Sequence, residues 1–338
     1  MPSNPESLPE AGTLTYLEAI SLALQEEMAK DESVFLMGQD IAEYGGAFKV
    51  TRDFVGEFGK DRLVNTPISE SGTIGMAVGA ALLGRRPIVE MQFADFVSCG
   101  FNQLVNVAAK MHWRTGAAVP LVVRLPVGAG AGAGPFHSQS MEAWFLHTPG
   151  LKVVAPSSPA DAYILLRAAV RDPNPVLYLE HKSLYRRLKG SVEIEKGTDS
   201  DALRCGVARV LRQGADAVVL TYGRPVHAAV EAAEMLAADG VSIAVVDLCT
   251  LMPLDESTML EWVQRTGRVL IVHEAGLTGG FGAELAARVA DSAFAYLDAP
   301  IRRLAFPDHP VPFHKTLEDG CLPSTETIAT ALVDLVGW

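Results

Sequence analysis

The 338-residue sequence lacks the features that mark several classes of protein. Lysine and arginine number 28 against 40 aspartate and glutamate residues, a net charge of −12. That balance disfavours nucleic acid and anionic membrane surfaces as partners. No uncharged apolar run is long enough to cross a bilayer. We therefore expect neither a nucleic-acid partner nor a membrane location.

Cysteine is scarce, and its spacing excludes the common structural uses of this residue. Cys99, Cys205, Cys249 and Cys321 lie far apart and form no Cys-x-x-Cys pair. The histidines form no His-Glu-x-x-His motif. These absences predict a reduced, cytoplasmic protein without a zinc site.

The N-terminus lacks the features of a targeting segment. Its first residues are rich in proline and carry Glu6 and Glu10 but no lysine or arginine, unlike a signal or transit peptide. We predict that residues 1–13 are a disordered leader.

Apolar segments alternate in type along the first half of the chain. Helical spacing predicts an amphipathic helix over 14–30. A partly apolar helix is predicted over 99–113, and it should be buried. Short apolar runs predict strands at 33–38, 85–93, 120–127, 151–158 and 175–181. Strands that alternate with helices predict an α/β fold with a doubly wound, mostly parallel sheet.

The composition changes near 186–201, where charged residues replace large apolar ones. We predict a linker at 189–201 between domains at 14–188 and 202–338. The second domain repeats the α/β alternation. Its helices are predicted at 224–239, 255–266, 280–292 and 324–336.

Glu70 opens a helix predicted over 72–84 that consists almost wholly of small residues. Glycine is a poor helix former, so this composition does not favour a helix that is stable by itself. Small side chains instead allow the backbone of another segment to approach closely. One interpretation makes Glu70 a complement to the helix dipole. The other makes it a general acid or base whose pKa is raised by Pro67 and Ile68.

Phe93, Asp95 and Phe96 follow the strand after that helix. Side chains at the carboxyl end of a parallel strand border the ligand crevice in this kind of fold. This cluster therefore predicts the lip of a binding site.

Glycine alternates with alanine from Gly128 to Gly134. The spacing matches neither a phosphate-binding loop nor the dinucleotide fingerprint. The run is either a flexible connection or a mobile loop that covers a site and carries His137 at its end. In the second interpretation His137 is a candidate proton donor.

Residues 273–285 combine a strand, a glycine turn and a helix start. This order suggests either an anion site at the helix N-terminus or a plain structural turn. Glu274 and Glu284 would oppose an anion there.

Several segments, taken in order, resemble one family. They are TPISESGTIG, EMQFADF, PFHSQSMEAWFLHTPGLKVVAPSSPADA, RDPNPVLYLE, TYG, DLCTLMPLD and HEAGLTGGFGAEL. They resemble the β subunits of thiamine-diphosphate-dependent 2-oxo acid dehydrogenases, the decarboxylase components of multienzyme complexes. The resemblance runs from about residue 14 to the end. It implies a transketolase-like pyrimidine-binding domain followed by a transketolase C-terminal domain.

The resemblance also implies site residues. Glu70 falls on the family's glutamate, which hydrogen-bonds N1′ of the aminopyrimidine and favours its imino tautomer. Ile68, Gln92 and Phe96 fall on positions that line this ring, and branched-chain members often carry tyrosine at the position of Phe96. His137 falls on an active-site histidine that is implied to orient substrate or to assist reductive acylation of the lipoyl group.

A structural potassium site is implied on four further residues. Leu121 and Ala169 would bind through backbone carbonyls, and Asp172 and Asn174 complete the match. In the alternative interpretation, Asp172 and Asn174 are plain turn residues in RDPNP.

One expected motif is absent. Thiamine enzymes hold the diphosphate through magnesium on a motif that begins Gly-Asp-Gly, and this sequence has none. The resemblance therefore implies that thiamine diphosphate is shared with an α subunit, which holds the magnesium, in an α2β2 heterotetramer. The C-terminal domain is expected to dock the lipoyl acyltransferase core.

The implied activity is that of a 2-oxo acid dehydrogenase with a disulfide acceptor. The run Gln-Phe-Ala-Asp at 92–95 favours branched-chain substrates, with pyruvate or acetoin as the alternative. Two other interpretations stay open: a fragment of a transketolase or deoxyxylulose-phosphate synthase, and a non-catalytic assembly subunit of the same fold.

Overall fold

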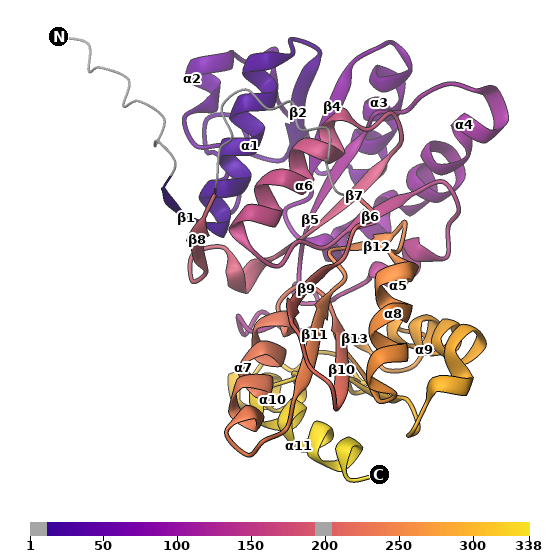
Figure 1. Ribbon diagram of the computed structural model, residues 1–338. Coiled ribbons are helices and arrows are strands. Elements are labelled where there is room, and N and C mark those ends of the chain that lie inside the picture. The colour runs from indigo at the N-terminus through magenta and orange to yellow at the C-terminus, as the bar shows by residue number, and fades with distance from the viewer. Residues whose placement is uncertain (1–11, 193–204) are drawn as a thin grey trace.

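The computed structural model describes residues 12–192 and 205–338. Figure 1 shows the first half of the chain in indigo to pink above the second half in orange to yellow. Each half is built on its own sheet, and a small third sheet pairs β1 (Thr13–Thr15) with β8 (Lys189–Ser191) in antiparallel fashion. No helix in the described ranges is long and apolar enough to cross a membrane.

The first sheet has seven strands. They are β2 (Val34–Gly38), β3 (Leu63–Asn65), β4 (Arg86–Glu90), β5 (Val122–Val127), β6 (Lys152–Val154), β7 (Val176–His181) and β12 (Thr250–Met252). Their order is β12-β6-β7-β5-β4-β2-β3, and every neighbouring pair is parallel except β12 with β6.

Helices lie on both faces of this sheet. They are α1 (Tyr16–Lys30), α2 (Phe54–Phe58), α3 (Glu70–Leu82), α4 (Ala109–Thr115), α5 (Glu142–Leu146) and α6 (Pro159–Arg171). Successive strand residues point to opposite faces, so Ile88 packs in the cluster under α1 and α6 while Val89 packs in the cluster with α3. Burial on both faces explains why these strands are mostly apolar, and why the charged side chains among them, such as Arg124 and Glu180, are paired.

The second sheet has the order β14-β13-β10-β11-β9, and only β9 is antiparallel. Its strands are β9 (Arg209–Arg212), β10 (Ala217–Thr221), β11 (Ile243–Asp247), β13 (Val269–Gly276) and β14 (Arg302–Phe306). The helices of this half are α7 (Pro225–Ala237), α8 (Glu256–Thr266), α9 (Phe281–Ala293), α10 (Lys315–Cys321) and α11 (Thr325–Val336). The predicted α/β fold with mostly parallel sheets is confirmed.

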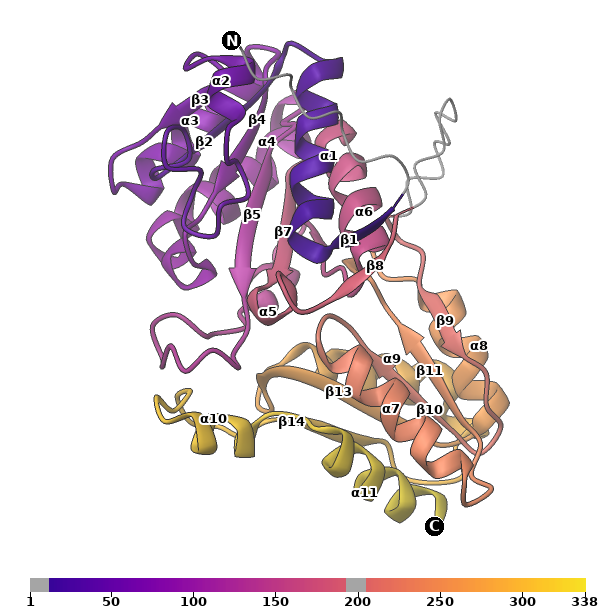
Figure 2. The ribbon, with the colours of Figure 1, turned by 90° about the vertical axis from the view of Figure 1, so that its left-hand side faces the viewer.

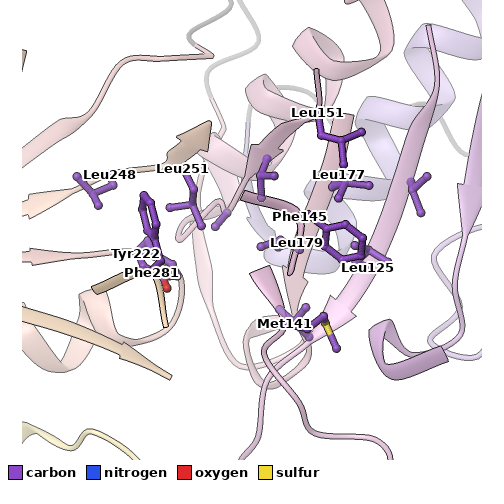
Figure 3. Packing of buried hydrophobic residues seen from close by; sticks show 14 of the residues in the cluster. Leu125, Met141, Phe145, Leu151, Leu177, Leu179, Tyr222, Leu248, Leu251 and Phe281 are labelled. Carbon is purple, nitrogen blue, oxygen red and sulfur yellow. The ribbon is translucent and has the colours of Figure 1, made fainter. Parts of the chain in front are cut away.

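The two halves share one apolar core. A single cluster of buried side chains includes Leu125 and Leu177 from the first sheet and Leu220 and Phe281 from the second half. Figure 3 shows its members facing one another across the junction. The strand β12 adds to this connection, because it belongs to the second half of the chain but pairs with β6 of the first.

The structure differs from the sequence-based expectations at three places. The helix predicted over 99–113 is divided into a 3₁₀ turn, η1 (Ala94–Gly100), a π-helical turn, η2 (Gln103–Ala108), and α4. Its end is not buried, since Trp113 is 94% exposed. Residues 189–191 of the predicted linker form β8, and Thr13 of the predicted leader belongs to β1. Residues 1–11 of the leader and 193–201 of the linker lie outside the described residues, so the domain boundary stays a prediction.

Candidate active site

The predicted site residues follow the carboxyl ends of parallel strands in one part of the first sheet. Gln92 and Phe96 follow β4, His137 follows β5, and Glu70 follows β3 at the start of α3. This edge is where open α/β sheets bind ligands. The topology therefore brings residues that are far apart in the sequence to one edge.

Glu70 is the first residue of α3 and is partly buried. Its Oε1 accepts a long hydrogen bond of 3.4 Å from Nε2 of Gln39, which follows β2. The expected apolar surroundings are not formed by its sequence neighbours, because Pro67 is exposed and Ile68 is 83% exposed. The side chain of Ile68 instead forms an exposed apolar surface at this edge of the sheet.

His137 lies against two phenylalanine rings. The centroid of its ring is 4.7 Å from that of Phe93 and 5.6 Å from that of Phe96, both edge-to-face. Phe48 extends the cluster, with its centroid 5.5 Å from Phe93. The structure thus brings together Phe96 and His137, which sequence analysis had placed in one site. Phe48 was missed because the loop after β2 carries only a glycine-turn signal.

Asp95 lies in η1 between the two phenylalanines and is buried. Its Oδ1 accepts hydrogen bonds from the backbone N–H of Gln139 at 3.1 Å and from Nε2 of Gln139 at 2.9 Å. The other oxygen, Oδ2, is buried without a protein partner. Asp95 therefore ties the turn that carries Phe96 to the loop that carries His137.

Lys182 supplies a buried positive charge behind this turn. Its Nζ donates to the carbonyl of Pro126 at 3.0 Å and lies 5.8 Å from the centre of the Phe93 ring. Burial lowers the pKa of Lys182 to about 8, although the nearby carboxylates of Asp95, Glu274 and Glu318 oppose that decrease. No sequence motif marked this lysine.

The glycine loop, residues 128–134, is fastened to the second half of the chain. The backbone N–H of Gly132 donates to Oε2 of Glu318 on α10 at 2.8 Å. A Cβ atom at Gly134 would lie 2.2 Å from the ring of Phe313, and the glycine has a φ of +68°. Figure 2 shows the loop after β5 reaching towards α10. The loop is therefore not an isolated flexible connection.

Buried ion pairs hold the strands beneath the site together. Arg124 on β5 donates two hydrogen bonds to Glu180 on β7, from Nε at 2.6 Å and from a terminal nitrogen at 2.8 Å. Its other terminal nitrogen pairs with Glu90 on β4. Tyr185 donates to the same Glu180 carboxylate at 2.7 Å. This pairing satisfies the buried charges and aligns the ends of the three strands.

Comparison with known proteins identifies the family. The family model "Transketolase, pyrimidine binding domain" matches residues 12–187, and "Transketolase, C-terminal domain" matches 206–328. The chain is 45% identical to "2-oxoisovalerate dehydrogenase subunit beta" of Bacillus subtilis, covering 95% of this chain and 98% of that protein. This chain belongs to the β subunits of the thiamine-diphosphate-dependent 2-oxo acid dehydrogenases.

Other similar β subunits differ in their named substrate. "Pyruvate dehydrogenase E1 component subunit beta" of Rhizobium meliloti is 43% identical, covering 98% of this chain and 72% of that one. "Acetoin:2,6-dichlorophenolindophenol oxidoreductase subunit beta" of Cupriavidus necator is 44% identical, covering 95% and 97%. The structure also resembles "Split gene transketolase, inactive beta4 tetramer", with a TM-score of 0.76 at 21% identity over 96% of this chain and 99% of that one. That likeness confirms the transketolase-like fold.

The residues at the sheet edge fit one half of thiamine diphosphate. A carboxylate at the start of α3, the exposed Ile68 beside it and the Phe96 ring at the same edge suit a flat, polar aminopyrimidine. The residues do not fit the diphosphate and its magnesium. Among the described residues, the candidate metal-binding group is Asp161, Asp247 and Cys249 at the junction, where Asp161 already pairs with Arg209.

The residues of the potassium prediction are engaged within this β subunit. Oδ1 of Asp172 accepts from the backbone N–H and side-chain amide of Asn174, at 2.9 Å and 3.1 Å. Its Oδ2 pairs with Lys152. The carbonyl of Leu121 accepts from Val176 at 2.8 Å, and that of Ala169 from Asp172 at 3.3 Å. These contacts describe the turn of the alternative interpretation, and potassium binding stays a prediction.

The glycine turn at 276–280 precedes α9 and borders a cavity of about 520 Å³ at the junction. Glu274, which we expected to oppose an anion here, instead accepts hydrogen bonds from His181 at 2.7 Å and Arg224 at 2.8 Å. Burial raises the pKa of Glu274, but these two partners outweigh it and hold the pKa at about 2. Glu284 accepts from Arg288 on the next helical turn. Both carboxylates therefore have structural partners.

Proposed function

We propose that this chain is the β subunit of a branched-chain-type 2-oxo acid dehydrogenase. The complete enzyme would oxidatively decarboxylate a 2-oxo acid and transfer the acyl group to the lipoyl group of an acyltransferase component. The observation that carries the proposal is the placement of Glu70, Phe96 and His137 at one edge of the sheet in a member of this family. The similarity to the Bacillus subtilis protein supports the substrate class.

Each residue has a distinct task in this proposal. Glu70 would hydrogen-bond N1′ of the aminopyrimidine and favour its imino tautomer. Ile68, Gln92 and Phe96 line the ring. His137 orients substrate or delivers a proton during transfer to the lipoyl group. Thiamine diphosphate, when bound, supplies the electron sink that decarboxylation requires.

An α subunit completes the site in this proposal. It contributes the diphosphate and magnesium half, which the donor groups of this chain do not fit, and the two chains form an α2β2 heterotetramer. Exposed apolar side chains of the same region, Met76 and Leu83, support a partner surface beside Ile68. In this proposal the C-terminal domain docks the lipoyl acyltransferase core, and potassium binds at the carbonyls of Leu121 and Ala169. The enzyme works in the cytoplasm, where its four free cysteines stay reduced.

The test is reconstitution with an α subunit. The complex should decarboxylate 3-methyl-2-oxobutanoate with a higher kcat/KM than pyruvate. Glu70→Gln should lower kcat at least about 100-fold, because proton transfer by a positioned side chain contributes 10²–10⁴-fold. Full activity of Glu70→Gln would refute its role, and activity of this chain alone would refute the shared site.

A second substrate class is supported by the other relatives. The similarity to β subunits named for pyruvate and acetoin is nearly as high, at 43% and 44% identity. A higher kcat/KM for pyruvate or acetoin in the same assay would favour that alternative. No turnover by the reconstituted complex would favour a non-catalytic assembly subunit.

A further inference from the structure

His137 has little of its own to hold it in place. Its backbone N–H bonds weakly to the carbonyl of Gly134 at 3.4 Å. Its ring packs edge-to-face with those of Phe93 and Phe96, and within the described residues it has no protein hydrogen-bond partner. Such edge-to-face ring contacts are weak and do not fix the position of an imidazole by themselves. Its position must therefore be set by the backbone on either side.

Gln139 is the point where that backbone is fastened. Its carbonyl accepts from the N–H of Gly128 at 3.2 Å, which closes the base of the loop. Its backbone N–H and side-chain amide both donate to Oδ1 of Asp95. One residue thus joins the start of the loop, its end and the turn η1.

We propose that Asp95 is a positioning residue for His137. Hydrogen bonds to a charged group are roughly twice as strong as neutral ones, so two of them to one carboxylate oxygen firmly restrain the end of the loop. Asp95 also lies between Phe93 and Phe96 in the sequence, so its bonds to Gln139 hold the loop against the turn that carries both rings. This inference rests on the proposed function of the site.

The surroundings keep Asp95 suited to this task. It is 6% exposed, and its free oxygen is buried. Lys182 is the nearby cation that balances its charge, with its ammonium over the ring of Phe93. A carboxylate that only served solubility would not be buried with a compensating lysine.

The test is a double-mutant cycle in the reconstituted αβ complex. Asp95→Ala and His137→Ala should each lower kcat/KM for acylation of a lipoyl domain, by a similar factor of about 100, since small misplacements of a catalytic group cost that much. The double variant should be no slower than His137→Ala alone. Asp95→Asn keeps a carbonyl oxygen for both hydrogen bonds but loses the charge, so its kcat/KM should lie between those of the wild type and Asp95→Ala. If the two losses multiply, or if Asp95→Ala stays within threefold of the wild type, the inference is wrong.

A second measurement does not depend on activity. Amide hydrogen exchange at residues 137–139 should speed up at least about tenfold in Asp95→Ala and stay slow in Asp95→Asn. Equal exchange in the wild type and Asp95→Ala would overturn the proposal even if the complex has no measurable activity. An inactive wild type with this exchange pattern would refute the proposed function and leave the positioning role of Asp95 standing.

Discussion

At the scale of single residues, Glu274 shows how a buried charge connects the two halves of the molecule. It comes from β13, while His181 ends β7 of the first sheet. Arg224 binds the other carboxylate oxygen from the start of α7. Burial alone would raise the pKa of Glu274 and make the ionised carboxylate costly. The hydrogen bonds from His181 and Arg224 outweigh burial and lower the pKa instead. The interactions of Glu274 with these two partners therefore make a pH-dependent contribution to the stability of the fold.

The sign of that dependence follows from the depressed pKa. The folded pKa of about 2 lies below the unfolded value near 4.5, so the stabilisation is complete above pH 4.5 and is lost as the pH falls towards 2. Glu274→Gln should lower the free energy of unfolding by about 3 kcal/mol at pH 7 and by much less near pH 2, at about 1.4 kcal/mol per pKa unit. Urea unfolding at both pH values measures this. Glu256→Gln, a control at a half-buried ion pair with Arg288 near the surface, should cost less than about 1 kcal/mol.

At the scale of structural elements, the glycine loop is the segment whose packing decides the site. Its glycines have φ values between +68° and +96°, which other residues adopt only with strain. Gly132 and Gly134 share the same φ of +68°, but their surroundings differ. A Cβ at Gly132 would have its nearest neighbour at 3.7 Å, while a Cβ at Gly134 would collide with Phe313. Substitutions at Gly132 and Gly134 therefore distinguish the cost of backbone strain, which both share, from the cost of a steric collision, which only Gly134 has.

We predict that Gly134→Ala destabilises the protein more than Gly132→Ala. Both should lose about 1–2 kcal/mol through backbone strain. Gly134→Ala should lose about 0.5–1.5 kcal/mol more, because the exposed Phe313 ring must leave its rotamer to avoid the collision, and should also lower activity because the loop carries His137. Thermal unfolding of the two variants tests this, and Phe313→Ala should relieve part of the added loss. Equal melting temperatures for both variants would show that Phe313 does not constrain the loop.

At the scale of the whole molecule, the shared core makes the two halves interdependent. One buried cluster runs through both sheets, and β12 crosses from one half to the sheet of the other. Tyr222 of the second half donates a 2.6 Å hydrogen bond to the buried Glu142 of the first. Neither half can expose this surface without a large cost in apolar burial.

We therefore predict that both halves unfold in one transition. Trp144 reports on the first half and Trp262 on the second, and the exposed Trp113 and Trp338 can be replaced by phenylalanine. In chains that keep only Trp144 or only Trp262, the fluorescence midpoints in urea should coincide. Two separate midpoints would mean that the shared core does not couple the halves.

Much of the secondary structure was predictable because its causes are local. The run of apolar residues at 175–181 predicted β7, and Ser158 followed by Pro159 predicted the start of α6, where Ser158 caps the helix. The interruption of 99–113 by a π-helical turn was not predictable, since the apolar pattern there continues without a break. The strand β12 was missed because three residues carry too little periodicity and its partner β6 is about 100 residues away.

Local patterns in the sequence were enough to predict the alternation of helices and strands, the family, and the candidates Glu70, Ile68, Gln92, Phe96 and His137, whose roles stay predictions. How these residues are held became visible in the folded chain alone. Gln139 meets Asp95 across 44 residues, and Gly132 meets Glu318 across 186. Such contacts leave no local pattern, because a hydrogen bond between distant residues depends on where the sheets and loops place them. A carboxylate that fastens a loop is therefore visible only in the folded chain.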